Sequence, residues 1–278
     1  MMRKDDMPAM NMRVTRDGPD LPDAPAATGG VPSAGAPFAE LGPLEAAWER
    51  LEWYRLDPRR LTARRVITAT RSDPAHVAFD LLRTRLMQAL KARGWRHVAI
   101  TSPTKGCGKT FVTANLALSL ARRASCRTVV MDLDLRLPNL STVFGIERPG
   151  SMQAFLTGER PLEQHLRRLA PNLAVGLNGA SVFDSAELLQ EPTTGRALDT
   201  LQETLKPDVM LYDLPPTLAC DDVLAFLPRV DGVLLVAGGG ITSAEDVRRC
   251  ERLFEGQAPL LGVILNKTED PVSEPYYG

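Results

Sequence analysis

Short apolar runs alternate with longer amphipathic stretches from about residue 97 onward. The runs that predict strands are 97–101, 127–132, 172–177, 208–213, 232–237 and 260–266. The stretches that predict helices are 109–123, 185–205, 219–227 and 243–255. This alternation predicts an α/β fold, a mostly parallel sheet with helices on both faces. Such sheets bind ligands beyond the carboxyl ends of their strands, so the chemistry is expected there.

The chain before residue 95 has a different pattern. Its first part is rich in Pro, Gly, Ala and Asp and lacks a repeating apolar face, which predicts disorder. A short helix is expected over 45–56 and a longer one over 74–93. The apolar positions at helical spacing in the longer helix are Val77, Leu81, Leu82, Leu86 and Leu90. Arginines between the helices indicate a solvated surface, or alternatively a docking patch for a membrane or partner. The expected division of the chain is a disordered segment over 1–44, a helical and basic region over 45–94, a P-loop domain over 95–270 and a tail over 271–278.

A glycine-rich loop, SPTKGCGKT, follows the first predicted strand and precedes a helix. Gly106 and Gly108 let backbone N–H groups turn inward around phosphates, and the helix N-terminus adds a positive dipole end. Lys109 suits the outer phosphates, and the Thr110 hydroxyl suits magnesium. Pro103 stands where the usual pattern begins with Gly, and a plain Gly-rich turn is the structural alternative. The residues expected to contact the nucleotide are Thr104, Lys105, Gly106, Cys107, Gly108, Lys109, Thr110 and Phe111.

Carboxylates end two of the predicted strands. Asp132 and Asp134 follow one apolar run and share a face by strand alternation, while Asp213 ends another run. Carboxylates beside a phosphate loop suit hydrated magnesium, and they also suit proton transfer from an attacking hydroxyl. The alternative is that one of the first two only caps a helix or turn. Asn266 ends the last strand, where its amide is expected either to read an adenine edge or to serve as a turn residue.

Bulk properties narrow the class of function. The net charge of -1 argues against a chain built to coat nucleic acid. No apolar run approaches the roughly 20 residues that span a bilayer, and the start lacks a signal-peptide core. The four cysteines are scattered, so no zinc site or redox dithiol is indicated. We therefore expect a soluble, cytoplasmic nucleotide-binding protein.

Together these motifs resemble the bacterial tyrosine kinases of capsule and exopolysaccharide synthesis, of the CpsD and CapB type, which are related to the MinD and ParA ATPases. The resemblance covers about residues 65–278. It rests on SPTKGCGKTFVTANLA, VVMDLDLRLPNLSTVFG, DVMLYDLPP, VDGVLLVAGGGITSAEDV and GVILNK. The Asp-x-Asp-x-Arg element discriminates, because ordinary P-loop enzymes lack it. The resemblance implies a protein-tyrosine kinase that uses ATP and Mg²⁺ and has accompanying ATPase activity. The implied roles are catalysis by Lys109, Asp132 and Asp134, metal binding by Thr110, Asp132, Asp134 and Asp213, and activation of the acceptor hydroxyl by Asp132.

Kinases of this family phosphorylate tyrosines near their own C-terminus. This sequence ends in EPYYG, so the resemblance implies Tyr276 and Tyr277 as acceptors. Glu269, Asp270 and Glu274 already make this tail acidic, so added phosphate should loosen a tail docked at an acidic magnesium site. Without the resemblance, a tyrosine pair that packs on the surface would be the simpler interpretation.

The sequence departs from the family pattern in three places. The family's tyrosine cluster is longer, and Leu214 stands where Thr is common. The Glu-x-x-Arg-x-x-Arg helix that joins family members into rings has its positions at Val77, Asp80 and Arg83, so only the last matches. Ring assembly through this helix is therefore left open.

Partners follow from the same resemblance. It implies an integral-membrane chain-length or co-polymerase protein that activates the kinase and recruits it to the inner membrane. It also implies self-association for trans-phosphorylation, without nucleic acid. The alternative function is a partitioning-type ATPase switch of the MinD and ParA kind without kinase activity. That group carries a signature lysine at the position of Thr104, with Lys105 one place later here, which favours the kinase.

Overall fold

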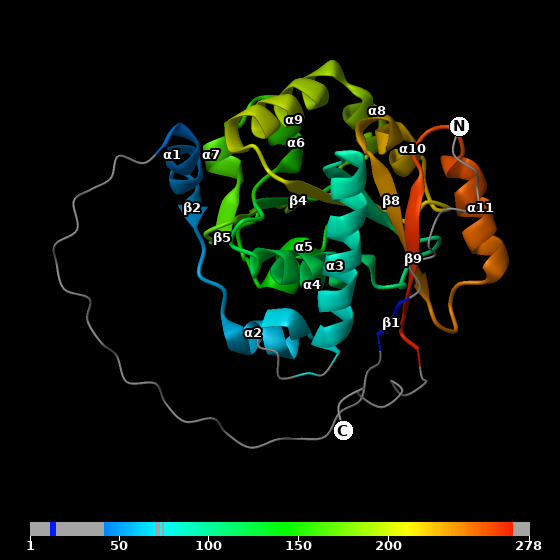
Figure 1. The fold of residues 1–278 in the computed structure, drawn as a ribbon. Helices are drawn as coiled ribbons and strands as arrows, with labels where there is room; N and C mark the ends of the chain where they lie inside the picture. The colour runs from blue at the N-terminus through cyan, green and yellow to red at the C-terminus, as the bar shows by residue number, and fades with distance from the viewer. Residues whose placement is uncertain (1–11, 15–41, 70–72, 74, 269–278) are drawn as a thin grey trace.

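The computed structural model describes residues 12–14, 42–69, 73 and 75–268 (Figure 1). The strands of this part form one sheet in the order β1-β9-β8-β3-β7-β4-β6-β5-β2. Their bounds are β1 Met12–Val14, β2 Glu52–Trp53, β3 His97–Thr101, β4 Thr128–Asp132, β5 Arg167–Ala170, β6 Leu173–Gly176, β7 Val209–Asp213, β8 Gly232–Gly238 and β9 Leu260–Asn266. Neighbouring strands are parallel except for β5 and β6, which are antiparallel. The predicted α/β fold with a mostly parallel sheet is confirmed.

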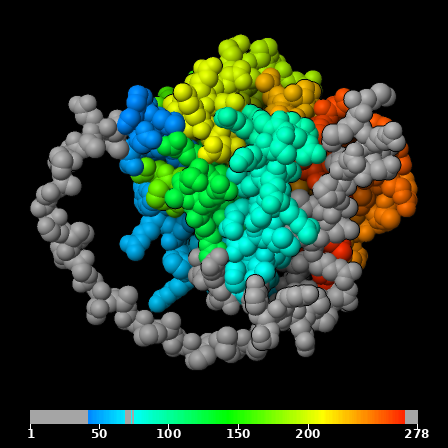
Figure 2. Space-filling view, in the orientation of Figure 1, coloured from blue at the N-terminus to red at the C-terminus, as the bar shows by residue number. Residues whose placement is uncertain are grey.

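Helices cover both faces of this sheet. They are α1 Pro43–Glu49, α2 Pro58–Ala63, α3 His76–Arg93, α4 Lys109–Ala121, α5 Leu140–Phe144, α6 Met152–Leu156, α7 Leu162–His165, α8 Ser185–Gln190, α9 Pro192–Leu205, α10 Asp222–Phe226 and α11 Ala244–Phe254, with 3-10 turns η2 Ile67–Ala69 and η3 Leu227–Arg229. Two apolar cores result, one with α2 to α5 and the other with α1, α6 and α8 to α11. In Figure 2 the side chains of α3 (cyan) fill the middle of the visible face.

Strand alternation explains how one sheet supplies two cores. Val98 and Ile100 of β3 enter the core under α3 and α4, whereas Ala99 between them enters the other. Likewise, Val130 of β4 faces the first core, and Val129 and Met131 face the second. Because both faces are covered, the central strands are apolar without a polar side.

Helix α3 turns a different face to the core than predicted. Its buried stripe is Phe79, Leu82, Leu86 and Leu90, whereas Val77 and Leu81 are 60 % and 44 % exposed. The spacing of three, four and four residues from Phe79 matches one helical face, so the aromatic ring anchors the stripe. The prediction that Val77 and Leu81 belong to this face was wrong.

Several other boundaries differ from expectation. The helix predicted over 185–205 is two helices, because Glu191 adopts an extended ψ of 142° before Pro192. The helix predicted over 45–56 ends at Glu49 and is followed by β2, which pairs with β5. Three residues of the segment expected to be disordered, Met12–Val14, pair with β9. Neither edge strand has an apolar alternation that would have predicted it.

The order of the central strands positions the chemistry. β3, β7 and β4 are consecutive neighbours, so the glycine-rich loop after β3 lies beside Asp213 and Asp132 at the ends of the other two. Within the part of the chain that the structure describes, no helix has both the length and the apolar character that a bilayer crossing needs.

Candidate active site

The loop between β3 and α4 turns on two glycines in left-handed conformation. Gly106 has φ 83° and Gly108 has φ 91°, and α4 begins at Lys109 immediately afterwards. Such torsions are strained for other residues and aim successive N–H groups inward. Pro103, which has no N–H, contributes its carbonyl as acceptor to the Leu218 N–H at 3.1 Å. The loop therefore has the form of a phosphate cradle despite the missing first glycine.

The last strand braces this loop. The Asn266 amide Nδ2 donates to the Cys107 carbonyl at 2.8 Å, and Asn266 is 5 % exposed. A Cβ added at Gly108 would collide with that amide. The donor expected to read adenine is therefore engaged within the protein, and Asn266 acts as a support for the loop. The Cys107 thiol is buried and donates to the Thr104 carbonyl at 3.2 Å.

Lys109 joins the loop to the carboxylates. Its Nζ contacts Asp134 Oδ2 at 2.6 Å and lies 3.8 Å from Asp213 Oδ1. The Nζ also donates to the Thr110 hydroxyl at 3.3 Å. Asp132 and Asp213 are register partners on β4 and β7, so they stand side by side at the sheet edge. The structure thus brings together the lysine, the threonine and the three aspartates that the sequence singled out.

The site contains three carboxylates and one ammonium group, and all four are buried. Asp132 and Asp213 are fully buried, and Asp134 and Lys109 are 5 % and 8 % exposed. Burial raises the pKa of Asp132 well above its usual range, and the charge of Asp213 raises it further. Burial also raises the pKa of Asp213, against the attraction of Lys109. Burial alone would lower the pKa of Lys109, but Asp213 and Asp134 raise it by more.

Two carboxylate oxygens at this site lack a partner. Asp132 Oδ2 accepts from the Leu140 N–H at 3.1 Å, but Oδ1 is buried and unpaired, as is Asp213 Oδ2. Asp134 Oδ1 accepts from the Leu137 N–H at 3.1 Å, so it also serves as a turn residue. Unpaired buried carboxylate oxygens are the kind of ligand that suits magnesium. Among the described residues no group of three or more acidic, His or Cys side chains is arranged to hold a metal alone. Phosphates would therefore complete such a site, as is usual for Mg²⁺.

Other predicted positions differ in their surroundings. Lys105 is exposed and Thr104 is half-buried at the loop. The Phe111 ring packs edge-on against Phe79, with centroids 5.8 Å apart, so only its backbone remains for a nucleotide. Tyr276 and Tyr277 lie outside the described residues.

Two residues that sequence reasoning missed support the acids. Thr113 is buried one turn after Lys109, and its hydroxyl donates to Asp213 Oδ1 at 3.3 Å. Its spacing of four from Lys109 was the available signal. Arg136 Nε donates to Asp222 Oδ1 at 2.9 Å, and Asp222 Oδ2 accepts from the Ser185 hydroxyl at 2.6 Å. This chain of bonds ties the Asp-x-Asp-x-Arg loop to α8 and α10, and no sequence spacing reveals it.

A family model described as ParA, NUBPL iron-transfer P-loop NTPase, matches residues 95–269. That range contains the loop, Lys109 and all three aspartates. The chain belongs to the ParA family of P-loop NTPases. Membership of this family implies that the site binds a nucleotide.

The similarity to bacterial tyrosine kinases is also confirmed. A Ralstonia solanacearum protein, provisionally named tyrosine-protein kinase EpsB, is 32 % identical over 220 residues, or 78 % of this chain. The chain spans 28 % of the length of that relative. The kinase domain of Escherichia coli tyrosine kinase ETK has a TM-score of 0.67 at 26 % identity, covering 77 % of this chain and 84 % of that one. MinD of Pyrococcus horikoshii in complex with Mg-ADP has a TM-score of 0.52 at 27 % identity, covering 63 % and 71 %.

Proposed function

We propose that this chain is an ATP-dependent protein-tyrosine autokinase that regulates the polymerisation and export of an exopolysaccharide or capsule. The observation that carries the proposal is the convergence of Lys109 with Asp132, Asp134 and Asp213 behind the glycine-rich loop. Similarity to named tyrosine kinases supports it, and in the ETK kinase domain this similarity covers 84 % of that chain. ATP and Mg²⁺ are the proposed cofactors, supported by the Mg-ADP that the MinD structure contains.

Lys109 can pair either with the carboxylates of the site or with the phosphates of a bound nucleotide. In this structure it is held by Asp134 at 2.6 Å, whereas a nucleotide in the loop would offer it phosphate oxygens. Moving Lys109 to the phosphates would free Asp134 Oδ2, at the more exposed edge of the site, for metal or acceptor. Binding of nucleotide would therefore break the ion pair between Lys109 and Asp134 and leave the Asp134 carboxylate available.

The proposed reaction is a phosphoryl transfer. The tyrosine oxygen forms a bond to the γ-phosphorus while the bond from that phosphorus to the ADP oxygen breaks. Asp132, whose Oδ1 has no partner within the protein, accepts the phenolic proton. Lys109 balances charge on the phosphates, and Thr113 and the Leu140 N–H hold the acids in place. Magnesium, when bound, would neutralise phosphate charge; the residues that would hold it are Thr110, Asp132, Asp134 and Asp213.

The acceptors are Tyr276 and Tyr277 of a second copy, phosphorylated in trans. We further propose a cytoplasmic location at the inner membrane, where an integral-membrane chain-length or co-polymerase protein recruits and activates the kinase. Self-association would not use Arg83 in its present state, because its guanidinium donates to Asp80 and to the Ser119 carbonyl within the same chain.

The proposal is tested by incubating the protein with γ-labelled ATP, Mg²⁺ and the cytoplasmic segment of its membrane partner. Label on tyrosine is expected for the wild type, with at least a tenfold loss for Lys109→Met. Replacing Tyr276 and Tyr277 together by Phe should remove the label while nucleotide binding persists. Absence of phosphotyrosine, or label that survives the double replacement, would refute the assignment.

A partitioning-type ATPase switch is the second candidate, favoured by the ParA family match and the MinD neighbour. It predicts ATP-dependent dimers and phosphate released only to solution. Measuring released phosphate and phosphotyrosine in the same reaction separates the two functions.

A further inference from the structure

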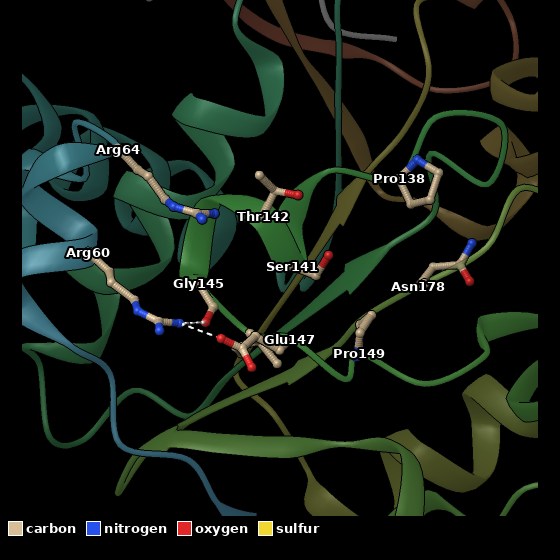
Figure 3. Close-up of a pocket in the computed structure, with 11 residues that line it drawn as sticks. Arg60, Arg64, Pro138, Ser141, Thr142, Gly145, Glu147, Pro149 and Asn178 are labelled. Atoms are coloured by element: carbon tan, nitrogen blue, oxygen red, sulfur yellow. Dashed lines mark hydrogen bonds and ion pairs between the residues drawn. The ribbon is translucent and has the colours of Figure 1, made fainter.

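A hollow of about 420 Å³ lies between α2, α5 and the loop after β6 (Figure 3). Arg60 of α2 and Arg64, the residue at the C-cap of that helix, form one wall, and Ser141 and Thr142 of α5 lie across from them. Pro138 and Asn178 form the opposite end. We call this hollow the arginine groove. The arginine groove is separate from the nucleotide site, because none of the nucleotide-site residues lines it.

One of the two arginines in the arginine groove has carboxylate partners and the other has none among the described residues. Arg60 donates to Glu147 at 3.0 Å and lies 3.8 Å from Asp57. The Arg64 side chain is exposed and its guanidinium has no hydrogen bond or ion pair within the described chain, and Figure 3 shows that guanidinium directed toward α5. Glu147, whose side chain is 77 % exposed, is the one carboxylate in the lining. A free guanidinium beside two hydroxyls is suited to a carboxylate ligand.

Two backbone hydrogen bonds connect the segment that lines the groove to the proposed catalytic acids. Helix α5 begins at Leu140, whose N–H is bound by Asp132, and ends beside Gly145 in the groove. Pro138 at the other end follows Leu137, whose N–H is bound by Asp134. An extended peptide lying in the groove would therefore lead to the phosphotransfer site.

We infer that the arginine groove docks the acidic C-terminal segment of a second copy of this chain and so guides its tyrosines to the acids. This rests on the proposed kinase function. Residues 269–278 read EDPVSEPYYG, with Glu269, Asp270 and Glu274 and no basic residue. The acidic residues precede the tyrosines, so they would occupy the groove while the tyrosines continue to the site. Charge complementarity of this kind selects both the partner and its direction.

Placing Glu269 and Asp270 in the groove requires a second copy, because the same two residues of the chain's own tail cannot reach it; only Glu274, eight residues past Asn266, could. Asn266 ends β9, and four strand spacings separate β9 from β4, or about 19 Å at about 4.8 Å each. Glu269 and Asp270 are three and four residues past Asn266, so they extend at most about 14 Å from it. The groove lies beyond β4 toward β6, farther still.

Peptide binding tests the groove without relying on catalysis. A fluorescent peptide of residues 268–278, with both tyrosines replaced by Phe, is titrated with nucleotide-free protein at low salt and followed by anisotropy. Arg64→Ala should weaken binding about tenfold, the value of one charge-assisted contact. Glu147→Gln should strengthen it by releasing Arg60. Arg196→Ala, an exposed arginine on α9 at the other end of the view in Figure 1, is the charge-matched control and should have no effect.

The same titration with Glu269→Gln, Asp270→Asn and Glu274→Gln in the peptide should lose binding to wild type and erase the effect of Arg64→Ala. Equal binding of the acidic and neutral peptides, or equal effects of Arg64→Ala and Arg196→Ala, would overturn the docking site. Folding of each variant is checked by its thermal transition.

Transfer between copies tests the source of the segment. An active protein with both tail tyrosines replaced by Phe is mixed with a Lys109→Met acceptor that keeps its tail. Phosphate should appear on the acceptor and fall about tenfold when the active copy carries Arg64→Ala. Absence of label on the acceptor, while wild-type protein alone labels its own tail tyrosines, would overturn the second-copy assignment. Should no tyrosine be labelled while the peptide titrations behave as expected, the kinase function fails and the docking site stands.

Discussion

Replacing Asp132 by Asn should stabilise the nucleotide-free protein while abolishing its phosphotransfer. Asp132 is fully buried beside Asp213, and the two acids share one lysine with Asp134. Asn keeps an oxygen for the Leu140 N–H and replaces the unpaired Oδ1 by an amide donor, which can pair with the unpaired Asp213 Oδ2. The change thus removes a buried charge and supplies a missing hydrogen bond.

The magnitude follows from those two unpaired atoms. Each buried polar atom without a partner costs about 1–3 kcal/mol, so one new bond that satisfies both should yield about 2 kcal/mol net. For a chain of this size that is a rise in Tm of about 4–8 °C. Because the folded-state pKa of Asp132 is raised, its titration makes the wild type lose stability as pH rises through that pKa, and the variant lacks this contribution. The advantage of the variant should therefore grow from pH 5 to pH 8.

Denaturant or thermal unfolding without nucleotide and magnesium, repeated across that pH range, measures the effect. Asp134→Asn is the matched control, since it breaks the 2.6 Å bond to Lys109 and should destabilise. A loss of stability in Asp132→Asn at pH 8, or a gain that does not change with pH, would refute the electrostatic account of this site.

Three further effects are expected. Burial lowers the pKa of His165 to about 4, so the wild type should lose about 3 kcal/mol of stability as pH falls from 6.5 to 4. His165→Phe preserves the stack on Phe155 and should remove most of this pH dependence in unfolding titrations. Gly108→Ala should reduce nucleotide affinity at least tenfold by calorimetry, because the residue has a φ of 91° and its added Cβ would meet the Asn266 amide. Gly158→Ala, at φ 85° with no atom near the added Cβ, is the control and should leave the affinity unchanged. Trp48→Ala should cost about 3–5 kcal/mol in chemical denaturation, since the ring is 2 % exposed and its Nε1 donates to a carbonyl at the end of α9; unchanged stability would contradict its role in anchoring α1.

The local sequence pattern was sufficient to predict strands whose burial is periodic and site residues that directly follow strand ends. The run 260–266 forms β9 with the predicted bounds, and the acids after β4 and β7 meet because parallel strands end at one edge. The contact of Lys109 with Asp134 follows from the same geometry. These features depend on residues close in sequence or on a rule of topology.

Long-range pairing was beyond sequence reasoning. β2 is only Glu52–Trp53, both exposed, and it pairs with β5, whose Arg168 forms a two-bond ion pair with Glu49 at 2.6 and 2.7 Å. The support of the loop by Asn266 likewise depends on a carbonyl far away in sequence. Neither contact leaves a periodic signal in either segment.

The central claim is that Lys109, Thr110 and the three aspartates hold a magnesium nucleotide, and calorimetric titration of the folded protein with ATP tests it most directly. Saturable binding at one site per chain is expected, weaker without magnesium and at least tenfold weaker in Lys109→Met. An affinity that is the same in the wild type and in Lys109→Met, or no binding of magnesium ATP to the folded wild type, would contradict the account.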